Sequence, residues 1–337
     1  MSELILVTGA NGFLALHIIK QLLTEGYRVR GTLRRRNQGA QVQAALAANH
    51  TPHLERLSFV QADLTEDAPW PAAMAGVSRV VSVAAPVFVN GEKATAALTQ
   101  TATAGTLRIL AAAVAAHVQR VVMTANLGAI GFSNHSNHPT TEADWTDPNE
   151  PGLSAYERSK LMAEKAAWAF AQTHHLELAT VAAGAMLGPA LGQHVSGSFG
   201  LVRQLLDGSR KITPPIRVNI SDVRDVADAH VRALFAPEAA GERFLAVAEG
   251  SISLPEISAL IRQQRPQLAA QLPAFTLPIW VLHVAAHFSE AAKEGRLFLT
   301  VNHDVSTAKA RARLGWQPKH TITETILTTV DILAEQP

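Results

Sequence analysis

Two residues with chemistry to offer, Tyr156 and Lys160, are four positions apart in a segment that runs from Ser154 to Phe170. This segment is rich in strong helix formers and opens on a serine, a residue type that caps helices. On a helix, residues four apart lie on one face, where the lysine ammonium would lower a phenol pKa that starts near about 10. A tyrosine tuned in this way can give a proton to a nascent alkoxide near neutral pH. A tyrosine and a lysine on a solvated helix face would have the same spacing, so the surrounding elements must decide.

The composition narrows the class of protein that carries this pair. The chain has 337 residues, 47% hydrophobic and 17% charged, as expected of a folded enzyme and not of a disordered chain. The formal net charge of +1 gives no bulk argument for nucleic acid or an anionic membrane as a partner. There is no cysteine, and His135 and His138 lack an evident third ligand, so we expect no metal site. No leader pattern precedes the first strand and no apolar run reaches about 18 residues, so a cytoplasmic protein is expected.

The start of the chain has the pattern of a dinucleotide-binding unit. An apolar run at 4–8 predicts a buried strand, and a glycine-containing turn and an amphipathic helix to about residue 25 follow it. The segment 27–33 predicts the next strand. A strand, a glycine turn, a helix and a strand within about 30 residues are the context that a dinucleotide fingerprint requires.

The turn itself has the spacing Gly-x-x-Gly-x-x-Ala. Gly9 permits a tight turn, Gly12 lets the backbone approach a pyrophosphate, and Ala15 is small enough for close helix packing. The pyrophosphate would sit at the helix N-terminus, against Phe13 and Leu14. A small-residue turn without a ligand is the competing interpretation.

A basic cluster follows the second predicted strand. An NAD site normally offers an acidic residue about 20 positions beyond the turn for the ribose 2′-hydroxyl. Between Glu25 and Glu55 there is no acidic residue, and Arg34, Arg35 and Arg36 occupy the end of the strand. Guanidinium groups bind a 2′-phosphate, which a carboxylate would repel. We therefore predict NADP(H) as the cofactor, with Arg34 as the first candidate for the contact and Arg35 as the second; a solvated basic loop is the alternative.

Strands and helices continue to alternate. The sequence predicts an alanine-rich helix from about 93 to 117 and further strands at 57–62, 80–85, 120–124 and 178–183. This alternation favours an α/β fold with a doubly wound parallel (Rossmann) sheet, whose ligands bind beyond the carboxyl ends of the strands. The candidate cofactor contacts at these ends are Asp63, Leu64, Ala84, Ala85, Thr124, Ala183 and Met186. Asp63 could accept from the adenine amino group or cap a helix that starts at Thr65.

Together these motifs resemble those of the extended short-chain dehydrogenase/reductases. Within them, the chain is most similar to the dihydroflavonol 4-reductase, cinnamoyl-CoA reductase and microbial carbonyl (aldehyde) reductase group. The resemblance covers nearly the whole chain and is carried by 7–14, 29–34, 154–168, 222–230 and 306–318. It implies that Tyr156 is the general acid, that Lys160 binds the nicotinamide ribose hydroxyls and lowers the tyrosine pKa, and that the loop 183–189 contacts the nicotinamide end.

One position departs from the pattern of that family. The family places a catalytic serine or threonine just after the fifth strand, where it polarises the substrate carbonyl. Here the segment reads Thr124-Ala125-Asn126, so the position falls on Asn126, or on Ala125 after a shift of one residue. We predict that the Asn126 amide donates to the substrate oxygen in place of a hydroxyl. The alternatives are that Asn126 only shapes a turn, or that catalysis is impaired.

The resemblance places the substrate between the sheet and a smaller C-terminal substrate lobe. Phe88 and Phe132 are candidates for an apolar substrate wall, with core packing as an equal alternative for each. Helices are expected at 199–206, 223–235, 254–261 and 277–288. The expected domains interleave: a dinucleotide-binding domain over 1–190 that is completed by about 216–250, and a substrate lobe from 191–215 and 251–337.

The sequence thus predicts an NADPH-dependent reductase of an aldehyde or ketone, with a small, aromatic or hydrophobic carbonyl compound as its partner and a monomer or homodimer as its assembly. One alternative is a sugar-nucleotide epimerase or dehydratase that retains NAD, for which Arg203, Arg210 and Lys211 could bind a diphosphate. Another is a non-catalytic dinucleotide sensor, suggested by the missing serine. The presence of both Tyr156 and Lys160 argues against the sensor.

Overall fold

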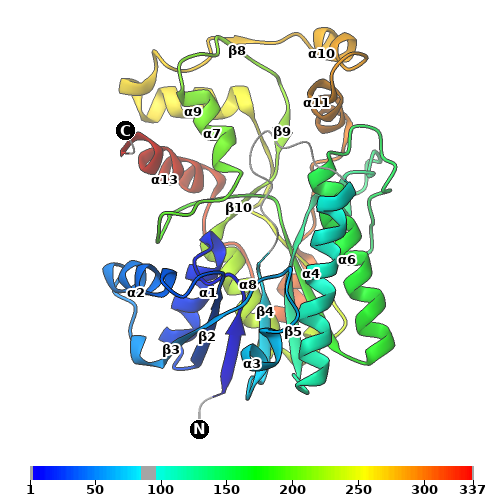
Figure 1. Cartoon of the computed structure of the whole chain (residues 1–337). Coiled ribbons are helices and arrows are strands. Elements are labelled where there is room, and N and C mark those ends of the chain that lie inside the picture. Colours follow the sequence, from blue (N-terminus) through cyan, green and yellow to red (C-terminus); the bar gives the residue numbers. More distant parts are fainter. Residues whose placement is uncertain (1–2, 85–95, 336–337) are drawn as a thin grey trace.

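A seven-stranded parallel sheet forms the centre of the protein (Figure 1). The computed structural model describes residues 3–84 and 96–335. In spatial order the strands are β3 (Leu57–Gln61), β2 (Arg28–Leu33), β1 (Leu4–Val7), β4 (Arg79–Ser82), β5 (Arg120–Asn126), β6 (Glu177–Ala183) and β11 (Arg243–Ala246). From β1 to β3 successive strands are added on one side of β1, and from β4 onward they are added on the other side. The boundary between β1 and β4 is therefore the switch point at which doubly wound sheets bind ligands. The predicted fold class is confirmed.

Helices cover both faces of this sheet. They are α1 (Phe13–Thr24) and α8 (Val223–Phe235) on one face, and α3 (Trp70–Met74), α4 (Ala96–Ala115) and α6 (Ala155–His174) on the other. Strand β1 contributes to both cores: Ile5 and Val7 pack with α1 and α8, whereas Leu4 and Leu6 pack with α4 and α6. Because successive strand side chains point to opposite faces, a strand covered on both sides is apolar throughout.

Some boundaries differ from those that the sequence predicts. The strand expected at 80–85 ends at Ser82, and the one expected at 120–124 continues to Asn126, because Asn126 still pairs with Ala183 of β6. Strand β11 was not predicted, since four residues without alternation give no periodic signal. Other elements that the sequence did not predict include α2 (Gln38–Ala48), α5 (Gly128–Gly131), α12 (Ala308–Leu314), and the 3₁₀ turns Leu54–Arg56, Pro237–Ala239 and Pro266–Leu268.

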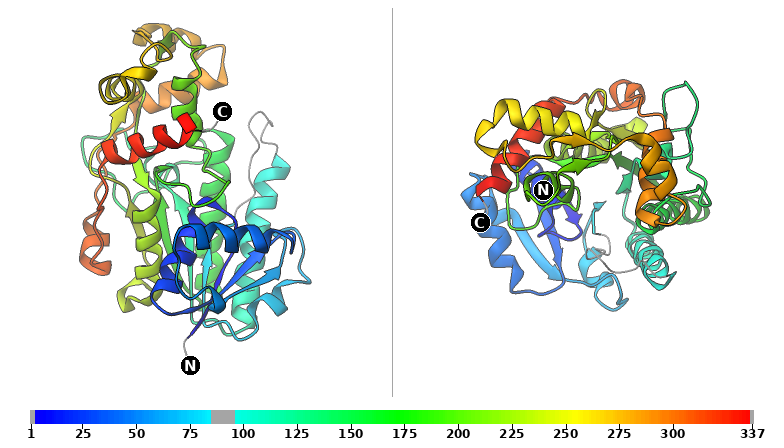
Figure 2. Two further views of the ribbon diagram at one scale, coloured as in Figure 1. Left: turned by 90° about the vertical axis from the view of Figure 1, so that its left-hand side faces the viewer. Right: turned by 90° about the horizontal axis from the view of Figure 1, so that it is seen from above.

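The remaining elements gather beyond the carboxyl ends of the strands (Figure 2). They are β7 (Ala185–Leu187), α7 (Phe199–Leu206), β8 (Ile212–Thr213), β9 (Arg217–Val218), β10 (Ile220–Asp222), β12 (Ile252–Ser253), α9 (Leu254–Gln264), β13 (Phe275–Thr276), α10 (Ile279–Ala285), α11 (Glu290–Thr300) and α13 (Ile322–Glu335). The single helix expected at 277–288 is shorter, and a second helix, α11, follows it. Ser289 starts α11 by accepting a hydrogen bond from the Ala292 N–H at 3.4 Å. Within the described residues, no helix is long and apolar enough to cross a membrane.

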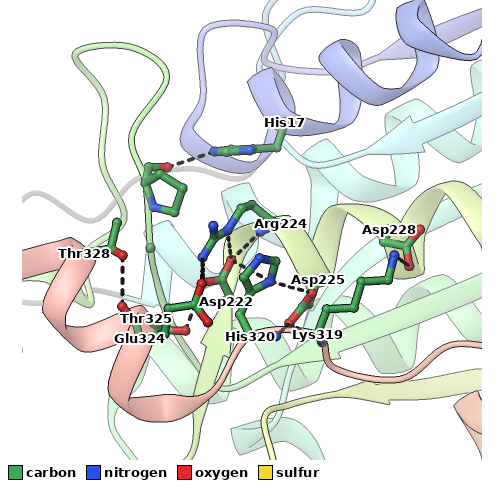
Figure 3. Close-up of polar contacts among 12 residues, drawn as sticks. His17, Asp222, Arg224, Asp225, Asp228, Lys319, His320, Glu324, Thr325 and Thr328 are labelled. Carbon is green, nitrogen blue, oxygen red and sulfur yellow. Dashed lines mark hydrogen bonds and ion pairs between the residues drawn. The ribbon is translucent and has the colours of Figure 1, made fainter. Parts of the chain in front are cut away.

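A buried polar network joins α8 to α13 and to the segment before it (Figure 3). Asp222, which is 1% exposed, accepts from Arg224 Nε and Nη2, both at 2.8 Å, and from Thr325 Oγ1 at 2.9 Å. Asp225 lies in the first turn of α8 and pairs with the His320 ring at 2.9 Å. These bonds fix the C-terminal helix α13 against the pair of short strands β7 and β10. Strand β7 follows directly after β6 in the chain.

Candidate active site

The loop after β1 has the geometry that close approach of a dinucleotide requires. Gly9 has a φ of +67°, in the left-handed region that favours glycine, and its N–H donates to Thr32 Oγ1 at 2.9 Å. The Gly12 N–H closes the turn on the Gly9 carbonyl at 2.8 Å. A side-chain carbon at Gly9 would lie 3.2 Å from the Cβ of Ala84. The glycine turn and the end of β4 are therefore neighbours at the switch point of the sheet.

Helix α1 begins at this turn with backbone donors exposed to the site. Gly12 is its N-cap and supplies no side-chain cap, so the N–H groups of the first turn can face an anion. Phe13 and Leu14 are only 7% and 4% exposed and belong to the core, so only their backbone can reach a pyrophosphate. Ala15 is fully buried, which agrees with the close packing predicted for it. The loop therefore fits a pyrophosphate.

Arg34 and Arg35 follow β2 as exposed side chains at the same sheet edge. Neither forms an ion pair with any carboxylate of the described segments. Hydrogen bonds from Thr65, and then the charge of Arg34, hold the pKa of Asp63 below its ordinary value. Guanidinium groups that have no ion-pair partner among the described residues fit the 2′-phosphate of NADP.

Asp63 and Leu64 lie at the end of β3. The Asp63 Oδ1 accepts from the Thr65 N–H at 2.9 Å and from its hydroxyl at 2.7 Å, which closes a local turn. The alternative role as the cap of a helix at Thr65 is wrong, because α3 begins only at Trp70. The Leu64 side chain is half-buried and lies close to Gly105 of α4. The adenine contact stays a prediction.

Tyr156 and Lys160 occupy the first turns of α6. Ser154 is the N-cap of this helix and accepts from the Glu157 N–H at 3.3 Å, as the sequence predicted. The Lys160 Nζ lies 5.8 Å from the centre of the Tyr156 ring, and within the described residues it has no hydrogen-bond or ion-pair partner. The Tyr156 side chain is 41% exposed. The helix therefore presents a phenol and an available ammonium on one face.

Burial dominates the acid–base properties of this pair. Desolvation is the largest influence on the pKa of Tyr156 and raises it, the Glu157 charge raises it further, and a hydrogen bond with Asn126 lowers it. Desolvation also lowers the pKa of Lys160 to about 8. The predicted lowering of the phenol pKa by Lys160 is therefore wrong for this structure.

Asn126 reaches the phenol from the last position of β5. Its Oδ1 accepts from the Gly128 N–H at 2.6 Å. Because this bond takes the amide oxygen, the NH₂ group is the donor in the hydrogen bond with Tyr156. The structure thus brings Asn126 and Tyr156 together, and the asparagine has a partner beyond the turn it shapes.

Thr124 has a different environment two residues earlier on β5. Its hydroxyl lies 2.8 Å from Nε2 of His230, whose Nδ1 lies 2.8 Å from the Val226 carbonyl. The carbonyl can only accept, so the ring proton is on Nδ1 and the Thr124 hydroxyl donates to Nε2. Burial lowers the pKa of His230 to about 4, so the ring stays neutral and this assignment holds at neutral pH. The Thr124 proton is therefore committed to His230.

The remaining residues predicted to contact the cofactor or the substrate are Ala183, Met186, Phe132, Ala85 and Phe88. Ala183 ends β6, and its carbonyl accepts from the Leu127 N–H at 2.9 Å; Met186 follows in β7 and is half-buried. Phe132 is half-buried and packs edge-on against Phe298 of α11, with ring centres 5.1 Å apart, which favours its packing role over a substrate wall. Ala85 and Phe88 lie outside the described residues.

The sequence predictions missed two acidic residues and a glycine beside the phenol. Glu157 follows Tyr156 directly, and Glu294 of α11 acts on it electrostatically. A Cβ at Gly128 would lie 2.8 Å from both Asn126 Oδ1 and Glu157 Cγ, so only glycine fits without a shift. The pattern Ser154-x-x-Glu157, typical of a capping box, could have indicated Glu157. Nothing in the sequence indicates that α11 packs there.

The chain is similar to a known protein family and to several known reductases. The family described as NAD dependent epimerase/dehydratase matches residues 5–246. Cinnamoyl-CoA reductase 1 of Oryza sativa subsp. japonica is 34% identical over 273 residues, which cover 80% of this chain and 78% of the relative. Ketoreductase azaE of Aspergillus niger is 32% identical over 301 residues, which cover 82% of this chain and 87% of the relative. The crystal structure of yeast methylglyoxal/isovaleraldehyde reductase Gre2 with NADPH has a TM-score of 0.79 at 24% identity and covers 98% of both chains.

These matches extend over the whole site. The family match includes the glycine turn, Asn126, and the pair of Tyr156 and Lys160. The likeness to Gre2, at its low identity, concerns the fold. The resemblance to the extended short-chain dehydrogenase/reductases is confirmed, and the chain belongs to the NAD-dependent epimerase/dehydratase family.

Proposed function

We propose that this protein is an NADPH-dependent reductase that converts an aldehyde or ketone to an alcohol. The observation that carries the proposal is the grouping of the Tyr156 hydroxyl, the Asn126 amide and the Lys160 ammonium at the carboxyl edge of the sheet. Two relatives that exceed 30% identity are named as reductases, which supports carbonyl reduction as the reaction.

The Tyr156 hydroxyl acts as the general acid. NADPH, when bound, supplies the hydride that adds to the carbonyl carbon. As negative charge develops on the carbonyl oxygen, the phenol gives it a proton. Burial holds the pKa of Tyr156 above its ordinary value, so the phenol carries its proton at neutral pH. Lys160, with a pKa of about 8, stays mainly protonated at pH 7 and can bind the ribose hydroxyls as a cation.

Asn126 takes the place of the hydroxyl that the family uses to polarise the carbonyl. A side-chain amide has two N–H donors, whereas a serine has one O–H donor. One N–H can bond with Tyr156 while the other donates to the substrate oxygen, since the Gly128 N–H holds the amide oxygen away. Thr124 cannot take this role, because its proton is donated to His230.

The cofactor is held by groups that follow two strands, β1 and β2. The turn from Gly9 to Gly12 and the N-terminus of α1 bind the pyrophosphate, and Arg34 and Arg35 bind the 2′-phosphate. The yeast reductase Gre2, which has the same fold, was crystallised with NADPH. We expect a preference for NADPH over NADH, and an aromatic or hydrophobic carbonyl substrate.

Oxidation of NADPH in the presence of aromatic aldehydes and β-keto esters tests the proposal. We expect turnover by the parent, and a loss of about 10²- to 10⁴-fold in Tyr156→Phe, the range for removal of a general acid. The matched control is Tyr27→Phe, because Tyr27 stacks on Phe235 with ring centres 4.6 Å apart and is the only other tyrosine. NADPH binding, followed by its fluorescence, should persist in both variants.

Three outcomes contradict the proposal. Tyr156→Phe could reduce carbonyls as fast as the parent, which would exclude the phenol as the acid. The purified protein could retain NAD tightly and show no turnover, which would favour the epimerase. It could bind NADPH without turning over any carbonyl compound, which would favour the sensor.

A further inference from the structure

The carboxyl group next to the catalytic tyrosine lies in an environment that disfavours its charge. The Glu157 side chain is directed at α5, where a Cβ on Gly128 would lie 2.8 Å from Glu157 Cγ. Its Oε2 is shielded from solvent and has no hydrogen-bond partner among the described residues. A shielded carboxylate oxygen without a donor is costly, and a proton relieves that cost.

Among the charged groups around Glu157, the Glu294 carboxylate favours its protonated form, whereas a cation such as the Lys160 ammonium favours the ionised form. Helix α5 reads Gly-Ala-Ile-Gly and carries no ionisable side chain. Helix α11 contributes Glu294; on α6, Tyr156 and Arg158 adjoin Glu157 in the chain, and Lys160 follows about one turn later. Burial is the main cause, and the charge of Glu294 the second, of a Glu157 pKa of about 7; burial raises the pKa of Glu294 as well. Glu157 therefore changes charge near neutral pH.

Glu157 affects the proposed site in two ways. Its negative charge raises the pKa of Tyr156. Its side chain also lies against Gly128, whose N–H holds the Asn126 amide oxygen at 2.6 Å. A single carboxyl group thus bears on the phenol and on the amide that bonds with the phenol.

We propose that Glu157 is a positioning residue whose proton controls the acidity of the Tyr156 hydroxyl. With the proton bound, no charge opposes the phenolate. After the proton is lost, the carboxylate opposes the phenolate, and the phenol keeps its own proton to a higher pH. The carboxylate therefore favours carbonyl reduction, which uses the phenol as an acid, over alcohol oxidation, which uses the phenolate as a base. This inference rests on the proposed role of Tyr156.

Carbon-13 NMR of protein labelled at the tyrosine Cζ tests the coupling without any need for turnover. The chain has two tyrosines, so Tyr156→Phe assigns both signals. In the parent, the Tyr156 signal should show a small step near pH 7, where Glu157 loses its proton, before the main titration at alkaline pH. In Glu157→Gln the step should vanish, and the main midpoint should fall by about one pH unit, as expected for removal of one nearby charge. The Tyr27 signal is the internal control and should not change.

Glu294→Gln is the matched carboxylate variant. It removes the charge that acts on Glu157, so the step near pH 7 should move to lower pH while the main Tyr156 midpoint stays in place. Glutamine at 157 keeps an oxygen that can accept from backbone N–H groups, and thermal unfolding verifies that the variant is folded. If Glu157→Gln does not fold, the test uses the step near pH 7 in the Tyr156 signal of the parent. Its movement to lower pH in Glu294→Gln supports the inference, and its absence from the parent contradicts it.

The inference is overturned if the Tyr156 signal has the same alkaline midpoint, and the same small step near pH 7, in the parent and in Glu157→Gln. The pH profile of alcohol oxidation with NADP⁺ gives the kinetic counterpart: its rising limb should move to lower pH in Glu157→Gln by the same interval as the NMR midpoint. An NMR shift without turnover of any substrate would support the coupling and contradict the proposed function. Turnover by the parent, with an NMR midpoint and a pH profile of alcohol oxidation that Glu157→Gln leaves unchanged, would support the proposed function and contradict the coupling.

Discussion

At the scale of single residues, the proposed replacement of a hydroxyl donor by the Asn126 amide requires a particular orientation of that amide. An asparagine can replace a serine as a donor only if its oxygen is prevented from facing the substrate, because that oxygen would repel a developing negative charge. The bond from the Gly128 N–H to Oδ1 meets this condition. The amide then offers donors on the side where Tyr156 lies.

Replacing Asn126 measures this role. We expect Asn126→Ala to lower the turnover number for carbonyl reduction by about 10²-fold or more, as for removal of an oxyanion-hole donor. Asn126→Ser restores a hydroxyl donor and should recover part of the loss. Steady-state rates at saturating NADPH and ketone give the comparison. An Asn126→Ala enzyme as fast as the parent would show that Asn126 only shapes the turn.

At the scale of elements, the site forms where the end of β5 meets the start of α6. Strand β5 runs on to Asn126 through its pairing with β6, and Ser154 starts α6 two residues before Tyr156. Helix α5 lies between these two elements in the chain and brings Gly128 against Asn126 of β5 and Glu157 of α6. A Cβ there would also lie 3.0 Å from Phe132, so three neighbours would have to move to admit a methyl group.

Gly128→Ala should therefore affect both activity and stability. We expect it to destabilise the fold by about 1–3 kcal/mol, as for overpacking, and to lower the reduction rate because Asn126 is displaced. The matched control is Gly200→Ala in α7, where an added Cβ meets nothing within 4 Å. That control should be neutral or stabilising, since alanine is the better helix former. Urea unfolding and NADPH oxidation give the two readouts; equal behaviour of the two variants would refute the packing argument.

At the scale of the whole molecule, the buried network at the start of α8 fixes the C-terminal helix to the sheet. Asp222 caps α8, binds Arg224 through both carboxyl oxygens, and accepts from Thr325 of α13 (Figure 3). Burial opposes its ionisation, but the hydrogen bonds from Arg224 outweigh burial and hold the pKa of Asp222 below its ordinary value of 3.8. The ionised form thus stabilises the folded state.

Asp222→Ala should cost about 3–5 kcal/mol of unfolding free energy at pH 7, because it leaves Arg224 partly buried without its partner. The Asp222 pKa is lower in the folded state than in the unfolded state. The stabilisation is therefore complete above the unfolded value, near pH 4, and is lost as the pH falls through the lower folded value. The difference between parent and variant in urea unfolding should shrink as the solution is acidified. Asp207→Ala, at an exposed turn, is the control and should change stability by less than about 0.5 kcal/mol.

Much of the fold could be read from the sequence because its signals are local. The apolar run of β1, the glycine spacing after it and the repeated alternation of strand and helix predict a doubly wound sheet, and α7 and α8 have the predicted boundaries. Short elements such as β11 could not be predicted, since four residues carry no period. Helix α11, which follows the helix expected at 277–288, could not be predicted because it begins at a serine cap that is one of many similar serines.

The sequence by itself determined which residues stand at the strand ends and at the start of the tyrosine helix, because strand and helix periods place them there. Only the tertiary structure decided their chemistry. It committed the Thr124 proton to His230 and turned the Asn126 amide toward Tyr156. Burial, and then the Glu157 charge, raises the phenol pKa, and Glu294 of α11 raises the pKa of Glu157. Hydrogen-bond direction and desolvation depend on groups far apart in the chain, and no local pattern encodes them.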